Sequence, residues 1–180
     1  VLIDALDVDS SKVHVLPHGV FDHLANVPDP KPLPDEFARV ERPVVLQFGL
    51  MRPYKGIDLM LEGFAAADPD AELWIVGAAR MDTAPLKTLA RDLGIEQRVR
   101  WLERFVGDDE LGAFFERADV VALPYRQIDQ SGVLFTALAF GKRAAILDGN
   151  VRRVLARHCS IAGYPGRPQI ERQFWQHAEW

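Results

Sequence analysis

Three short segments of this sequence combine cations, glycines and hydroxyl side chains in patterns that suit the binding of a small anion. In the first, residues 47–58 (QFGLMRPYKGID), an apolar run ends at Gly49, and Arg52 and Lys55 precede Gly56. Arginine offers a bidentate fork to a phosphate, lysine offers a point charge, and glycine lets backbone approach the ligand. This segment therefore predicts a diphosphate site, although a turn with two solvated cations would show the same residues.

The second segment, residues 123–134 (LPYRQIDQSGVL), joins the end of an apolar run to the start of a helix. Ser131 suits the N-cap position, and the amides of Gly132 and Val133 would then lie in the first helical turn, where no helical carbonyl reaches them. Such amides receive phosphate groups. A simple helix cap would account for the same Ser-Gly pair.

The third segment, residues 15–20 (VLPHGV), again runs from apolar residues into a glycine turn that contains His18 and Gly19. A single histidine at a turn is usually structural or solvated, and His18 has no neighbouring ligands that would mark a metal site. Its significance therefore depends on the other two segments.

The three segments lie within an alternation of short apolar runs and longer segments of helical period. This alternation predicts an α/β fold, a Rossmann-like parallel sheet with helices on both faces. Ligands of such sheets bind at the carboxyl ends of the strands, so we expect the three segments to meet at one edge. The expected strands are 13–16, 44–48, 73–76, 99–102, 120–123 and 144–147, and the expected helices are 57–67, 85–93, 109–118 and 132–140.

Composition and charge restrict the classes of partner. The chain has 180 residues, 48% of them hydrophobic, which suits one globular core, and its net charge of -5 argues against nucleic acid as the main partner. The single cysteine, Cys159, forms no internal disulfide and offers no metal-ligand cluster. We therefore expect a cytoplasmic protein that needs no metal and no other cofactor.

Taken together, the segments resemble one family, the retaining family-4 glycosyltransferases, whose GT-B fold places two Rossmann-like domains face to face. The resemblance is to their C-terminal domain and covers about residues 10–148 in the family's order and spacing. It lies in the segments VHVLPHGVFD, VVLQFGLMRPYKGIDLMLEGFA, AELWIVGAA and RVRWLERFVGDDELGAFFERADVVALPYRQIDQSGVLFTALAFGK.

The resemblance implies that this domain binds a nucleotide-diphosphate sugar and that the full-length enzyme transfers the sugar, with retention, to a polysaccharide or glycolipid acceptor. Arg52 and Lys55 match the catalytic cations on the donor diphosphate, and His18 and Gly19 face the interdomain cleft. Residues 77–80 and 104–106 fall where the family holds the nucleobase. The donor-binding positions that it implies are Gly49, Gly77, Arg104, Phe105, Val106, Gln130, Ser131, Gly132 and Val133.

The chain departs from the family pattern at three positions. Many members carry a Glu-x(7)-Glu pair, which aligns here with Ile128 and Thr136. A second arginine that follows the first-loop glycine in many members is Leu50 here, and we expect Arg52 to take its role. A subgroup with the same Arg-Pro-Tyr-Lys-Gly and Gln-Ser-Gly-Val loops also lacks the carboxylate pair, so the departure bears on sugar recognition more than on diphosphate binding.

The composition changes after Asp148. Residues 149–180 contain five arginines and two acidic residues, in a chain that is acidic as a whole, and the Gly-Gly that the family resemblance leads us to expect is missing. We therefore expect residues 1–148 to be the nucleotide-sugar-binding domain and residues 149–180 to be an atypical tail, truncated or frame-shifted.

No segment resembles the N-terminal domain that would hold the saccharide or lipid-linked acceptor. We expect this chain alone to be inactive in transfer and the full-length protein to act at the inner face of the membrane through that missing domain. Two alternatives remain open: a nucleotide-sugar-binding module without activity of its own, and a flavodoxin-like regulatory domain in which Arg52 and Lys55 are ordinary surface charges. A two-domain sugar-nucleotide epimerase shares the architecture, but the loops fit transferases better.

Overall fold

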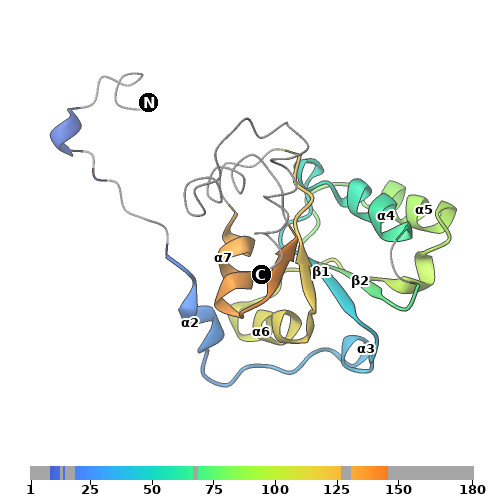
Figure 1. Ribbon diagram of the computed structural model, residues 1–180, viewed down its shortest axis with the longest axis horizontal. Coiled ribbons are helices and arrows are strands. Elements are labelled where there is room, and N and C mark those ends of the chain that lie inside the picture. The colour runs from blue at the N-terminus through green and yellow to red at the C-terminus, as the bar shows by residue number, and fades with distance from the viewer. Residues whose placement is uncertain (1–8, 13, 15–18, 67–68, 127–130, 146–180) are drawn as a thin grey trace, which may run out of the picture.

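A computed structural model of the chain describes residues 9–12, 14, 19–66, 69–126 and 131–145 (Figure 1). Its centre is a five-stranded parallel sheet in the order β3-β2-β1-β4-β5. The strands are β1 (Val44–Phe48), β2 (Glu72–Val76), β3 (Val99–Leu102), β4 (Val120–Ala122) and β5 (Arg143–Ala145). The chain builds outward from β1 to β3 and then returns to the other side of β1, so the topological switch point lies between β1 and β4, where open sheets of this kind bind ligands.

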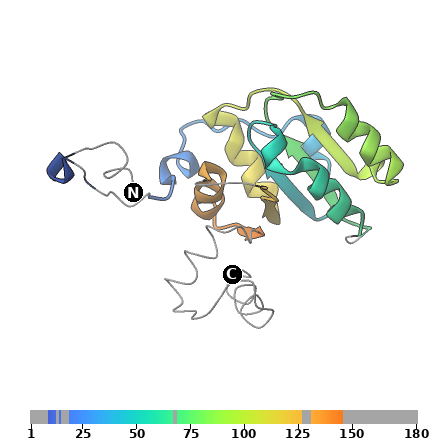
Figure 2. The ribbon, with the colours of Figure 1, turned by 90° about the horizontal axis from the view of Figure 1, so that it is seen from above.

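Four longer helices connect and cover the strands (Figures 1 and 2). They are α4 (Ile57–Ala65), α5 (Ala84–Asp92), α6 (Asp108–Arg117) and α7 (Gly132–Ala139). The shorter elements are the helices α2 (Asp22–Ala25) and α3 (Asp35–Ala38) and the 3-10 turns η1 (Ser10–Lys12), η2 (Pro53–Lys55) and η3 (Glu96–Arg98).

Both faces of the sheet are buried, as strand β2 shows. All five of its residues are buried, and neighbouring side chains point into different clusters. Leu73 and Ile75 pack with residues of α4 and α5, whereas Trp74 and Val76 pack with residues of α3 and α6. This burial on both sides explains the continuous apolar run of the strand.

The observed elements confirm the predicted fold class, and they agree closely with the predicted ranges. The helices end within two residues of their expected ends, and the acidic residues at 108–110 form the first turn of α6. Trp74, Phe114 and Phe115 lie in the core. The strand expected at 13–16 lies almost wholly outside the described residues, as does the tail at 149–180.

The loops after β1 and β2 pack against each other through two glycines. Gly49 and Gly77 both have positive φ, at 103° and 144°. A Cβ atom built on Gly77 would lie 2.1 Å from the carbonyl oxygen of Gly49, far inside van der Waals contact. Only glycine allows this backbone approach, so position 77 sets the distance between the two loops.

Replacement of Gly77 by alanine should therefore destabilise the protein by roughly 2 to 4 kcal/mol, because the new methyl group meets a backbone carbonyl and φ is unfavourable. Gly63→Ala is the matched control: Gly63 lies inside α4, and a Cβ there meets nothing within 4 Å. It should stabilise the protein by about 0.5 to 1 kcal/mol through helix propensity. Urea denaturation measures both, and equal effects would contradict the packing described here.

Candidate functional site

The loop after β1 turns sharply into a single 3-10 turn. Arg52 has extended backbone angles, Pro53 follows at the first position of η2, and the amide of Lys55 donates to the carbonyl of Arg52 at 2.9 Å. Gly56 then adopts the left-handed conformation, with φ of 64°, and α4 begins. Proline presets the turn and glycine ends it, which is why the sequence folds tightly here.

This turn packs directly against the backbone of the loop after β4. A Cβ atom on Gly56 would lie 2.1 Å from the carbonyl oxygen of Pro124. The amide of Arg126 donates to the carbonyl of Tyr54 at 2.8 Å. The two loops, almost 70 positions apart in the sequence, therefore form one unit at the carboxyl edge of the sheet.

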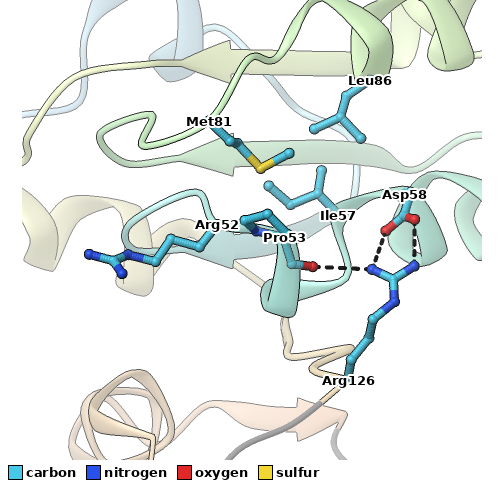
Figure 3. Close-up of a pocket in the computed structure, with 7 residues that line it drawn as sticks. All are labelled: Arg52, Pro53, Ile57, Asp58, Met81, Leu86 and Arg126. Atoms are coloured by element: carbon cyan, nitrogen blue, oxygen red, sulfur yellow. Dashed lines mark hydrogen bonds and ion pairs between the residues drawn. The ribbon is translucent and has the colours of Figure 1, made fainter.

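The side chain of Arg126 also links the two loops. Its guanidinium binds both carboxylate oxygens of Asp58, at 2.8 and 2.5 Å, and donates to the carbonyl of Pro53 at 3.1 Å (Figure 3). The hydrogen bonds from Arg126 hold the pKa of the Asp58 carboxyl below its usual range. Below the turn, the buried amide of Gln47 donates to the carbonyl of Lys55 at 3.2 Å.

Lys55 is the unusual residue of this unit, because its side chain is only 7% exposed. Its Nζ donates to the Tyr125 hydroxyl at 2.5 Å and lies 4.1 Å from the centre of the Tyr125 ring. In the part of the chain that the structure describes, no carboxylate lies within ion-pair distance of this nitrogen. Burial lowers the pKa of Lys55 from its usual 10.5 to about 8. A buried cation without a counter-ion is costly, so an anionic ligand would be strongly favoured here.

The start of α7 faces the same point. Ser131 is the N-cap, and its hydroxyl accepts from the amide of Leu134 at 3.2 Å. The amides of Gly132 and Val133 have no hydrogen-bond partner among the described residues, as expected for the first turn of a helix. A Cβ atom built on Gly49 would lie 3.3 Å from the Val133 side chain and 3.6 Å from the Lys55 nitrogen.

The structure thus brings the predicted site residues Lys55, Gly77 and Val133 beside Gly49, and Gln130 lies outside the described residues. Gly49 and Lys55 come from the segment after β1 and the helix start comes from the segment after β4, so the parallel sheet brings two separate segments together. Their chemistry is that of an anion site: one ammonium group, free amides and a helix dipole that favours negative charge.

Arg52 lies at the start of the same turn, directly before Pro53. It is exposed, and with Asp58 and Arg126 it lines a small pocket of about 120 Å³ whose other walls are apolar. Figure 3 shows its guanidinium extended away from the paired Asp58 and Arg126. Lys55 is not among the residues that line this pocket, and a joint role of Arg52 and Lys55 at one diphosphate stays a prediction.

The residues expected around a nucleobase lie after β2 and β3. Gly77 packs against the backbone of Gly49, and the Arg104 guanidinium forms an ion pair with Glu110 at 2.7 Å. Phe105 is 71% exposed, but the Val106 side chain is buried in the core, so Val106 offers a ligand only its backbone.

Of the two residues expected at an interdomain cleft, His18 lies outside the described residues and Gly19 is exposed. The chain that follows packs on α7, because Phe21 meets Phe135 edge to face at 6.2 Å. A Cβ atom on Gly132 would lie 3.4 Å from the Phe21 ring. The segment after Gly19 therefore reaches the start of α7, where the free amides lie.

The sequence analysis did not single out Tyr125, Arg126 or Asp58. Each acts through a partner far away in the chain, and such pairing leaves no periodic pattern. The available signal was position: an aromatic and a basic residue directly after a strand, in the segment Pro-Tyr-Arg, lie at the edge where ligands bind.

Two further properties concern metals and membranes. Across the described residues, no group of three or more His, Cys, Asp or Glu side chains could hold a metal ion. None of the helices described is both long and apolar enough to cross a bilayer. That the donor binds without a metal stays a prediction.

The fold is that of an α/β domain, and its candidate anion site lies at the switch point of the sheet. The chain belongs to the group 1 glycosyl transferases: the sequence profile described as "Glycosyl transferases group 1" matches residues 42–172. The match includes residues 149–172, which the composition set apart.

Individual relatives agree with this assignment. The chain is 32% identical over 115 residues to the GDP-mannose:glycolipid 4-beta-D-mannosyltransferase of Xanthomonas campestris pv. campestris, covering 60% of this chain and 32% of that protein. Among solved structures, it is similar to WaaG, a glycosyltransferase involved in lipopolysaccharide biosynthesis, with a TM-score of 0.60, 21% identity and coverage of 77% of this chain and 38% of WaaG.

A structure of HepE from Anabaena in complex with UDP and glucose shares 25% identity and a TM-score of 0.52, over 61% of this chain and 30% of HepE. The chain therefore spans about a third of the length of these relatives.

Burial of the Lys55 charge should reduce stability, and this gives a direct test of the site. The folded state holds the proton less tightly than the unfolded state does, so the penalty is present at pH 7, shrinks as pH rises through about 8 and is gone above 10.5. Lys55→Met should therefore be about 1 to 3 kcal/mol more stable than the wild type at pH 7 in urea denaturation, and this advantage should shrink by pH 9.5.

Lys142→Met is the control, because Lys142 is less buried than Lys55 and its ammonium donates to the carbonyl of Glu116 at 2.8 Å. It should change stability by less than about 0.5 kcal/mol at either pH. A clear loss of stability in Lys55→Met at pH 7 would assign Lys55 a structural role instead.

Proposed function

We propose that the full-length protein transfers a sugar from a nucleotide-diphosphate sugar to a polysaccharide or glycolipid acceptor, and that the domain described here binds the donor. The observation that carries this proposal is the buried Lys55 ammonium, which has no carboxylate partner in the described part of the chain and lies beside Gly49 and the start of α7. A diphosphate supplies the missing negative charge and fits a helix N-terminus.

The chemistry of such a site is electrostatic. As the bond between the sugar and the diphosphate breaks, negative charge grows on the departing phosphate oxygen. The buried Lys55 ammonium and the amides of Gly132 and Val133 are already oriented by the fold, so they stabilise that charge without reorganising. Arg52, exposed on the outer side of the turn, adds a second cation at the mouth of the site, and no step requires a metal.

The relatives support a nucleotide-sugar donor. By its name, the Xanthomonas enzyme uses GDP-mannose and a glycolipid, and the HepE structure contains UDP and glucose. Because this chain spans about a third of each, we assign the acceptor and the turnover to the full-length protein. A second domain would hold the acceptor, and through it the protein would work at the inner face of the membrane.

Retention of anomeric configuration is the part of the proposal that rests on the resemblance to family 4. The Glu-x(7)-Glu pair of that family is absent here, and Thr136, at the second of its positions, is buried and donates to the carbonyl of Gly132 at 3.0 Å. Proton NMR of the first product formed by the full-length protein decides this point, since a product of the opposite anomeric configuration to the donor would contradict retention.

Direct binding tests the proposal most simply. Titration calorimetry with UDP, GDP and their sugars should show binding that a chelator does not abolish. Lys55→Ala should weaken it by roughly ten- to a hundredfold, since a charge-assisted contact contributes about 1.5 to 3 kcal/mol. Arg52→Lys should weaken it as well, because a point charge does not reproduce the bidentate fork.

Two basic residues away from the loops, the partly buried Lys142 and the exposed Arg91, provide controls. Lys142→Ala and Arg91→Lys should leave affinity within about twofold, since neither group reaches the site. The diphosphate site is wrong if Lys55→Ala and Lys142→Ala behave alike, or if binding disappears with chelator. The flavodoxin-like regulatory domain would then be the better account.

A further inference from the structure

Tyr125 occupies a position that the family resemblance does not assign to the donor. It follows β4 by three residues, is 8% exposed, and belongs to the core cluster on the α6 side of the sheet. Its hydroxyl, however, meets the Lys55 ammonium at 2.5 Å, and its ring centre lies 4.1 Å from the same nitrogen. The Tyr125 side chain is therefore packed in the core, while its hydroxyl contacts the buried Lys55 ammonium.

We infer that Tyr125 is a positioning residue, whose hydroxyl and ring hold the Lys55 ammonium in place for the donor diphosphate. This inference rests on the proposed function, because it concerns the same site. It adds Tyr125 to the site as a residue that acts through Lys55 and does not itself match a donor-binding position.

The chemistry of a phenol suits this role better than that of a carboxylate. An ammonium group has three N–H donors and needs an acceptor when it is buried. A carboxylate at this place would form an ion pair and cancel the charge that the ligand must meet. The Tyr125 hydroxyl accepts a hydrogen bond but stays neutral, and its ring attracts the cation through the π face. The positive charge of Lys55 is thus held without being neutralised.

Neighbouring contacts keep Tyr125 itself in place. On one side, the carbonyl of Pro124 lies against Gly56, and on the other the amide of Arg126 donates to the carbonyl of Tyr54 at 2.8 Å. The Tyr125 and Tyr54 rings meet edge to face at 6.0 Å. Tyr125 could leave Lys55 only if the two loops separated.

The charged and titratable groups around Lys55 come from three elements. Its own turn contributes Arg52 and Tyr54, α4 contributes Asp58, and the loop after β4 contributes Tyr125 and Arg126. Asp58 and Arg126 neutralise each other through their bidentate pair. Described residues of β1 and α7 present only uncharged groups here. Tyr125 is therefore the described group that sets the environment of the ammonium most directly.

A change at Tyr125 should consequently alter the pH dependence of binding. Burial lowers the pKa of Lys55 to about 8, and a diphosphate favours the protonated form. Affinity should be constant below about pH 8 and fall above it. If the hydroxyl is removed, the ammonium loses its acceptor, so the proton leaves at lower pH and the fall begins earlier.

The experiment is a calorimetric titration of the protein with UDP and with GDP between pH 7 and 9.5, where the terminal phosphate stays ionised. Tyr125→Phe keeps the ring and the packing and removes only the hydroxyl. It should weaken binding at pH 7 by about three- to tenfold and lower the pH at which affinity begins to fall by at least about half a unit. Circular dichroism confirms that the variant is folded.

Tyr54→Phe is the matched control. The Tyr54 ring centre is 5.8 Å from the Lys55 nitrogen, and the hydroxyl that accepts a hydrogen bond from this nitrogen is that of Tyr125. It should leave the pH dependence unchanged. If the wild type binds but Tyr125→Phe keeps its affinity, or loses affinity without any shift in pH dependence, Tyr125 has no positioning role and the inference is overturned. If the wild type binds neither nucleotide, the proposed function itself fails.

Discussion

The contact of glycine backbone with carbonyl oxygens across the carboxyl edge of the sheet is the constraint on which the site depends. Gly77 lies against the carbonyl of Gly49, and Gly56 lies against that of Pro124. No side chain fits between these backbones, so the loops after β1, β2 and β4 are held at fixed distances. The ammonium of Lys55 is buried because these loops enclose it, and it meets the start of α7 because the sheet order places β4 beside β1.

A buried lysine gives the fold no evident stability. The sheet has both faces covered and a core that includes Phe37, Trp74 and Phe114 in edge-to-face contact, so it does not need a charge at its edge. Active sites commonly keep such groups at the expense of stability, because a perturbed cation is useful to a ligand. Arg126 differs, because its charge is paired with Asp58 and it links the two loops. Lys55 is the cation that we propose binds the ligand.

Much of the fold could be predicted because its elements depend on local pattern. Strands covered on both faces are continuous apolar runs, as in 44–48, and the helices between them carry an apolar stripe. The approach of Val133, at the start of α7, to the loop of Gly49 and Lys55 followed from one rule, that parallel strands present their carboxyl ends at one edge. Tyr125 and Arg126 could not be predicted in the same way, since their roles arise from partners that only the folded chain brings near. The burial of Lys55, three residues after an exposed Arg52, depends on the turn at Pro53, which no spacing rule gives.

The central claim is that the Lys55 ammonium is buried without a carboxylate partner among the described residues and is the group that meets the donor diphosphate. NMR of the protein with ¹³C-labelled lysine measures it directly, because the Cε shift of Lys55, assigned by comparison with Lys55→Ala, follows its protonation. The account predicts a pKa near 8 in the free protein and a clearly higher value when UDP or GDP is bound. A pKa near 10.5 in the free protein that nucleotide leaves unchanged would contradict it.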